Sequence, residues 1–187
     1  LESEPLLEQF FKDHNTAQFL VSRQLDVLRY PVYGETLTAR TSVYECRGFY
    51  GFRNTVLCDE KERPCMESYS VGAFVNLETG RLTRLPKEVI ASVRIEPRHE
   101  MEYLDKKINW QPENADEAFA PIPVAAADID FNRHMNNAKY VRAALAFLPE
   151  RPVKRLRVEY ITPAKRGELL IPKLSKTGEA TYCIALD

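Results

Sequence analysis

The sequence has no apolar run close to the ~20 residues that a membrane-spanning helix requires. Its first residues include Glu2, Glu4 and Glu8, where a secretion signal would have a basic and an apolar segment. These two absences predict a cytoplasmic protein without a membrane span.

Glycine and cysteine are used in ways that exclude several kinds of site. The 7 glycines form neither a Gly-rich phosphate loop nor the G-x-S-x-G turn of serine hydrolases. The 4 cysteines form no C-x-x-C pair and stand apart from the 3 histidines, which argues against a zinc site and a disulfide framework. We therefore expect no metal site and no nucleotide-binding turn.

Charge of one sign does not dominate the chain. The formal net charge is −1, which argues against a general nucleic-acid-binding protein. Basic residues nevertheless outnumber acidic ones between residues 151 and 176. Such a stretch predicts either a solvated strand face or a docking surface for an acidic partner.

The 187 residues, 44% of them hydrophobic, suffice for one large domain or two small ones. A short apolar stripe predicts a helix from Leu6 to about Asn15, and β-rich stretches separated by turns predict strands at 19–27, 36–46, 50–58 and 65–77. Along the first strand, alternation places Phe19, Val21, Leu25 and Val27 on one face, and Gln24 and Asp26 on the other. This order indicates an antiparallel sheet packed against a helix.

The second half has a similar pattern. Periodicity fades from about residue 86 to 121, and it then returns as a helix at 137–148 and strands at 156–160, 169–176 and 182–186. The Tyr-Pro-Gly-Glu turn at 30–35 resembles the one at 160–168, which favours two copies of one unit over two unrelated hairpins. We expect an N-terminal domain at 1–90, a linker at 91–120 and a C-terminal domain at 121–187.

The stretch most suggestive of chemistry runs from Asp130 to Asn137. In an extended segment alternate side chains share a face, so a carboxylate, an imidazole and two amides would converge there, from Asp130, Asn132, His134 and Asn136. Asn136 or Asn137 is the natural cap of the helix that follows, and a helix start favours an oxyanion. The alternative is plain turn chemistry, with an Asx turn, a capping Asn and a loop histidine.

These residues resemble the bacterial acyl-(acyl-carrier-protein) thioesterases, whose hallmark is D-x-N-x-H-x-N-N-x-x-Y. The motif fits Asp130, Asn132, His134, Asn136, Asn137 and Tyr140. Further similarity lies at 20–23, 29–31, 34–35 and 81–86, so the resemblance covers nearly the whole chain.

The resemblance implies an α+β protein with tandem hotdog folds, each a helix wrapped by a curved antiparallel β-sheet. It implies that Asp130, Asn132 and His134 are catalytic, with the thioester carbonyl near Asn136 and Asn137. It also implies hydrolysis of acyl-carrier-protein thioesters to free fatty acid without a cofactor, and a homodimer is a further expectation. Because carrier proteins are acidic as a class, a docking surface is expected at Arg151, Lys154, Arg155, Arg157, Lys165 and Arg166.

Two departures from the family pattern qualify this expectation. Family members often carry an acidic residue where this chain has Pro163 and Ala164, so the general base falls to His134 or Asp130, with Glu159 and Glu168 nearby in sequence. The first unit also opens on a short helix, and the second stops after about three strands. The chain is thus expected to be a fragment or to lack residues at its ends.

Three other functions remain open from the sequence. A hotdog protein can hydrolyse coenzyme A thioesters, hydrate an enoyl thioester with an Asp and His pair, or bind acyl thioesters without turning them over. Thiol release separates the hydrolases from the other two.

Overall fold

The computed structural model describes residues 4–187 and divides them into two compact units. The first runs up to Lys107 and includes Val153–Glu159, and the second comprises Ile108–Pro152 and Tyr160–Asp187. Residues 91–107, expected as part of a linker, therefore lie in the first unit. The strand expected at 156–160 lies there too, apart from its last residue.

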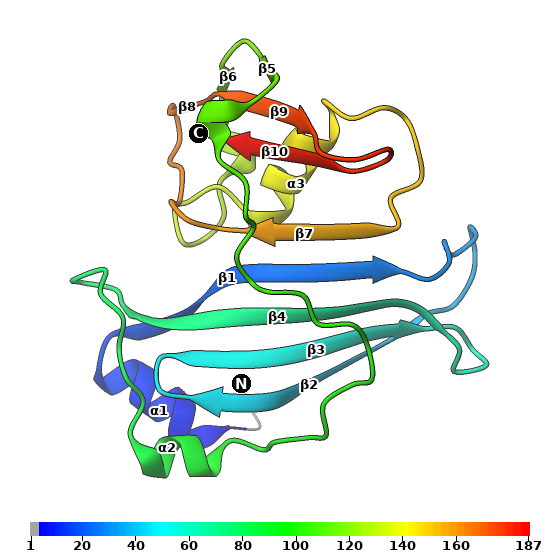
Figure 1. The fold of residues 1–187 in the computed structure, drawn as a ribbon. Coiled ribbons are helices and arrows are strands. Elements are labelled where there is room, and N and C mark those ends of the chain that lie inside the picture. Colours follow the sequence, from blue (N-terminus) through cyan, green and yellow to red (C-terminus); the bar gives the residue numbers. More distant parts are fainter. Residues whose placement is uncertain (1–3) are drawn as a thin grey trace. The chain divides into compact units, whose positions relative to one another are not determined.

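The first unit is built on a five-stranded antiparallel sheet with the strand order β2-β3-β4-β1-β7 (Figure 1). The strands span Thr16–Val27 (β1), Thr38–Arg47 (β2), Tyr50–Cys58 (β3), Pro64–Asn76 (β4) and Arg155–Glu159 (β7). The four predicted strands of this half are confirmed to within a few residues, because each is a long β-branched and aromatic run bounded by turn residues.

Two helices, α1 (Pro5–Asp13) and α2 (Lys87–Ser92), pack together at one end of this sheet. Leu7 and Phe10 of α1 and Val89 of α2 form a buried cluster around Phe74 of β4. Pro5 stands in the first turn of α1, where its missing N–H costs nothing. The predicted helix is thereby confirmed, with its end at Asp13.

The predicted faces of β1 are wrong in one respect: Phe19 shares a face with Gln24 and Asp26, and not with Leu25 and Val27. The register against β4 shifts between Leu20 and Ser22, and one extra residue in a strand reverses the alternation beyond it. Gln24 and Asp26 are consequently buried, at 1% and 6% exposure. The polar face of this strand points inward, against the usual pattern.

An irregular segment at 99–107 covers that polar face, and we call it the strap. The Gln24 amide binds it twice, donating to the carbonyl of Glu102 at 2.8 Å and accepting from the N–H of Leu104 at 3.2 Å. Asn54 of β3 accepts from the N–H of His99 at 3.2 Å.

Two further strands hold the strap. The Tyr69 hydroxyl of β4 donates to the carbonyl of Leu104, and the Arg157 guanidinium of β7 donates to the carbonyls of Asp105 and Lys107. These side chains, together with Gln24 and Asn54, supply hydrogen-bond partners to backbone groups of the strap that no neighbouring strand pairs. The inward polar residues of the sheet are thus explained by the strap.

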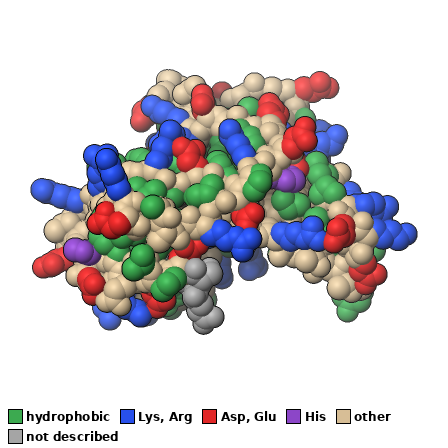
Figure 2. All heavy atoms as spheres, turned by 90° about the horizontal axis from the view of Figure 1, so that it is seen from below, with side chains coloured by type: hydrophobic (Ala, Val, Ile, Leu, Met, Phe, Trp, Pro, Cys, Tyr) green, Lys and Arg blue, Asp and Glu red, His purple; other side chains and the backbone are tan. Residues whose placement is uncertain are grey.

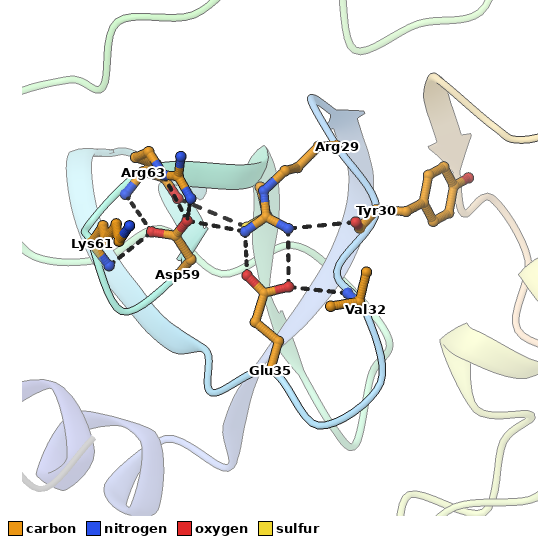
Figure 3. Close-up of polar contacts among 8 residues, drawn as sticks. Arg29, Tyr30, Val32, Glu35, Asp59, Lys61 and Arg63 are labelled. Atoms are coloured by element: carbon orange, nitrogen blue, oxygen red, sulfur yellow. Dashed lines mark hydrogen bonds and ion pairs between the residues drawn. The ribbon is translucent and has the colours of Figure 1, made fainter.

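The turn between β1 and β2 is held by an ion network (Figure 3). The Arg29 guanidinium forks onto the Glu35 carboxylate and also reaches Asp59 at 3.1 Å. Asp59, almost fully buried, accepts further hydrogen bonds from the N–H groups of Lys61 and Arg63 at 2.9 Å. Bidentate pairing of this kind fixes geometry as well as charge.

The second unit has smaller sheets. Its strands are β5 (Glu117–Ala118), β6 (Ile122–Pro123), β8 (Leu169–Leu170), β9 (Pro172–Lys176) and β10 (Tyr182–Leu186), with the orders β10-β9-β5 and β6-β8. Its helices are α3 (Asn137–Leu145) and the short turns η1 (Pro112–Asn114) and η2 (Ala126–Asp128). The helix predicted at 137–148 ends three residues early.

A small buried cluster of Val124, Met135, Ala164 and Leu170 forms the core beneath the start of α3. One of its members, Ala164, was singled out from the sequence, and another, Met135, lies next to His134. No helix of residues 4–187 is long and apolar enough to cross a membrane.

Candidate active site

The segment from Asp130 to His134 is a tight turn, and the prediction of an extended segment is wrong. An isolated antiparallel bridge joins Ile129 to Met135, and the N–H of Asp130 donates to the carbonyl of His134 at 2.9 Å. Arg133 sits at a φ of 63°, in the left-handed region. Alternation therefore does not place the motif side chains on one face.

Asp130 makes the Asx turn of the alternative interpretation. One of its carboxylate oxygens accepts from the N–H of Asn132 at 2.8 Å, and its carbonyl accepts from the N–H of Arg133 at 3.0 Å. An Asp side chain that bonds to the backbone two residues on favours a turn over a strand. Asn132 itself is exposed, at the tip of this turn.

His134 is half-buried, and its Nδ1 atom is buried without a hydrogen-bond partner among the residues described. A buried polar atom left unpaired costs about 1–3 kcal/mol, and such atoms in native proteins call for an explanation such as a catalytic role or a missing ligand. The carboxylate of Asp130 does not hold this nitrogen in the structure. Within residues 4–187, therefore, no carboxylate orients His134 through this nitrogen.

Asn136 caps α3, as predicted. Its side-chain oxygen accepts from the N–H of Ala138 at 2.9 Å, and its carbonyl accepts from the N–H of Lys139 at 2.8 Å. The N–H of Asn137, the first residue of the helix, makes no hydrogen bond within the part of the chain that the structure describes. The helix start thus keeps one donor for an incoming oxygen.

Asp128 supports this start and was missed in the sequence. Its carbonyl accepts from the N–H of Asn136 at 2.8 Å, and its carboxylate pairs with Lys139 at 3.3 Å and accepts from the N–H of Ala125 at 3.0 Å. The signal in the sequence is that Asp128 lies two residues before Asp130. In an extended segment the two would share a face, so alternation alone does not show that their roles differ.

The floor of the site is the backbone of Ala164. Its carbonyl accepts from the N–H of Met135 at 2.8 Å, and its N–H donates to the Tyr140 hydroxyl at 2.6 Å. The Tyr160 hydroxyl donates to the carbonyl of Asn137 at 3.2 Å, and its ring meets that of Tyr140 edge to face. Burial raises the pKa of Tyr140, so the phenol stays protonated at neutral pH.

Pro163 and Ala164, the positions where the sequence resemblance led us to look for an acid, supply none. Pro163 is exposed, and the side chain of Ala164 is 7% exposed among apolar neighbours. Glu168 is exposed, and its carboxylate accepts from the N–H of Lys165 at 2.8 Å, within their own turn.

The residues expected to dock a carrier protein fall into two groups. Arg155 pairs with Asp26 at 2.5 Å and with Glu102 at 2.8 Å, and Arg157 donates to carbonyls of the strap. These two cations have structural partners. The others, Arg151, Lys154, Lys165 and Arg166, are exposed, and they are divided between the two units.

Figure 2 shows basic and acidic side chains interspersed over the face that it presents, in keeping with the small net charge. A shallow hollow of about 390 Å³ lies in the first unit, where Asp26, Glu67 and Glu102 face Lys154 and Arg155. No motif residue lines it. Residues 4–187 contain no group of three His, Cys, Asp or Glu that could hold a metal ion.

The fold is that of solved acyl-carrier-protein thioesterases of the hotdog class. An acyl-ACP thioesterase from Bacteroides thetaiotaomicron matches 94% of this chain and 72% of its own, with a TM-score of 0.81 at 18% identity. The 12:0-ACP thioesterase from Umbellularia californica matches 95% of this chain and 74% of its own, with a TM-score of 0.76 at 18% identity. The predicted α+β hotdog fold is confirmed.

The chain belongs to the acyl-ACP thioesterase family. The acyl-ACP thioesterase N-terminal domain matches residues 5–93, and the acyl-ACP thioesterase C-terminal domain matches residues 111–183.

Curated relatives support this assignment. Two chloroplastic acyl-[acyl-carrier-protein] hydrolases of Cuphea viscosissima, FATB3 and FATB2, are 26% and 30% identical over 79% and 67% of this chain. The chain spans only 38% and 32% of their lengths.

Proposed function

We propose that the protein hydrolyses acyl-(acyl-carrier-protein) thioesters and releases free fatty acid. The observation that carries the proposal is a family motif whose histidine ends a tight turn immediately before a capped helix start. The motif lies within the match to the C-terminal domain of the family at residues 111–183, and the N-terminal domain matches residues 5–93. Thioester hydrolysis needs a base for water and a donor for the oxyanion, and this arrangement offers both.

His134 is the proposed general base. A neutral imidazole has an acceptor nitrogen and can take a proton from water. Its buried, unpaired Nδ1 is consistent with a polar group supplied by the substrate or by the water that attacks it. Asn132, exposed at the tip of the turn, would hold that water or the carbonyl.

Asp130 is proposed to act through the turn that it closes, since its carboxylate is bonded to the backbone of Asn132. A covalent route through Asp130 as nucleophile is the second mechanism to test. The thioester oxygen would bind at Asn136 and Asn137, where the free N–H of Asn137 stabilises the tetrahedral oxyanion. One such donor contributes about 3 kcal/mol in comparable sites.

The acidic carrier protein is the proposed partner, and the exposed cations Arg151, Lys154, Lys165 and Arg166 are its proposed contacts. Opposite charges on two proteins speed their association, and this attraction weakens as the salt concentration rises. Arg155 and Arg157 remain in the proposal only as supports for their strand, because their charges already have partners. The cytoplasmic location and the homodimer stay predictions.

Thiol release tests the function directly. The protein is expected to release thiol from acyl-carrier-protein esters, and faster from these than from the same acyl groups on coenzyme A. Faster release from coenzyme A esters would favour the coenzyme A hydrolase. Water addition to an enoyl ester without thiol release would favour the hydratase, and tight acyl-carrier binding without either reaction would favour a binding protein.

A further inference from the structure

Ala164 forms the floor of the candidate site through its backbone, and its methyl side chain carries no reactive group. Ala164 uses its carbonyl to hold Met135, next to His134, and its N–H to hold Tyr140, in the first turn of α3. Its methyl group is buried against Met135, Val124 and Leu170. The turn and the helix start are therefore joined through one backbone unit.

We call this connection from Met135 through Ala164 to Tyr140 the joint, and the Tyr140 side chain completes it. Its hydroxyl oxygen is the acceptor for the N–H of Ala164, at 2.6 Å, which is short for such a bond. Without that oxygen the buried N–H would lose its partner, and an unsatisfied buried donor shifts the backbone or admits water. The ring is also held edge to face by Tyr160, whose own hydroxyl binds the carbonyl of Asn137.

The position of the backbone at Ala164 matters for the reaction because a displacement of reacting groups by about 1 Å can lower the rate about 10²-fold. His134 and the N–H of Asn137 lie on the two elements that the joint connects. A shift of Ala164 would change the separation between base and oxyanion donor without removing either group.

Resting on the proposed hydrolase function, we propose that Tyr140 is a positioning residue that acts through the backbone of Ala164 to fix His134 relative to the start of α3. The backbone of Ala164 thus serves as a clamp between the turn and the helix start. Tyr140 itself does not touch the substrate in this proposal.

The test is Tyr140→Phe in the full chain, with Tyr30→Phe as the matched control. Tyr30 also donates its hydroxyl to a backbone carbonyl, that of Val153 at 2.8 Å, and both residues belong to the first unit, whereas the motif belongs to the second. Amide hydrogen exchange reports the clamp, and steady-state hydrolysis of a small acyl thioester reports the chemistry.

Tyr140→Phe is expected to speed exchange at Met135 and Ala164 and to lower kcat about tenfold or more, with KM within twofold. Tyr30→Phe should leave both unchanged. Faster exchange with unchanged kcat overturns the positioning role, and so does a fall in kcat without faster exchange, because the hydroxyl would then act on the substrate itself. A wild-type protein that releases no thiol overturns the proposed function, whatever the exchange at Ala164.

Discussion

Several carboxylate and amide side chains of this protein accept hydrogen bonds from backbone N–H groups close to them in sequence. Asp59 accepts from the N–H groups of Lys61 and Arg63, and Asp130 accepts from that of Asn132. Asn136 does the same for Ala138 at the helix start. Each of these side chains stabilises a turn or a cap, which is where Asp and Asn have their largest structural effect.

Asp59 gives the clearest prediction of pH dependence. The hydrogen bond from the N–H of Arg63, with further help from its guanidinium, lowers the pKa of Asp59 to about 2. A carboxyl whose pKa is lowered on folding adds stability above its unfolded pKa of about 4, and that stability is lost as the pH falls towards 2. Asp59→Asn is expected to lower the free energy of unfolding at pH 7 and to flatten its decline between about pH 4 and 2.

Denaturant titrations over that pH range measure this effect. Glu60→Gln, at the exposed neighbouring position, is the control and should behave like the wild type. An Asp59→Asn variant with the wild-type decline would show that another group governs acid stability.

At the scale of elements, the strap is the feature least visible in the sequence. Its residues have no periodicity because they are held by side chains of β1, β3, β4 and β7 and not by a neighbouring strand. Gln24 and Asp26 alternate with apolar residues as solvent-facing residues do. The pattern therefore predicts that they face solvent. They are buried instead, because the register shifts between Leu20 and Ser22 and because the strap covers this face.

Gln24→Ala is expected to lower the free energy of unfolding by about 2 kcal/mol, since it removes a buried amide that binds the partly buried backbone of Glu102 and Leu104. It should also speed amide exchange at Leu104, whose N–H it frees. Arg23→Ala, one residue along the same strand and exposed, is the control. Equal effects of the two changes would mean that the strap is held by other contacts.

Elements with long, regular patterns were predictable, and irregular ones were not. The strands up to Asn76 and the helices starting at Pro5 and Asn137 follow from runs of apolar residues with turn residues beside them. The candidate site was predictable in its residue types and its capping Asn136. Its geometry was not, because a turn closed by Ile129 and Met135 and a floor made by the backbone of Ala164 depend on contacts distant in sequence.

At the scale of the whole molecule, the relevant property is which cations are available to bind an acidic partner. The net charge is −1, and Arg155 and Arg157 have internal partners. Changing Arg151, Lys165 and Arg166 together to Glu is therefore expected to raise KM for a carrier-bound substrate about tenfold at low salt, with little change for a small thioester.

The matched control changes three exposed cations of the first unit, Arg81, Arg84 and Lys87, to Glu, so that the net charge shifts by the same amount. An equal rise in KM in both variants would show that net charge, and not a docking surface, controls association. High salt should reduce the difference between the docking variant and the wild type.

The most direct measurement is thiol release from an acyl-carrier-protein ester by the wild type, by His134→Ala and by His134→Gln, at equal folded fractions checked by denaturant unfolding. The account predicts wild-type release and a loss of 10²-fold or more in both variants, since a positioned base contributes about 10²–10⁴ to the rate. Turnover at the wild-type rate in either variant would contradict it and would remove His134 from the mechanism.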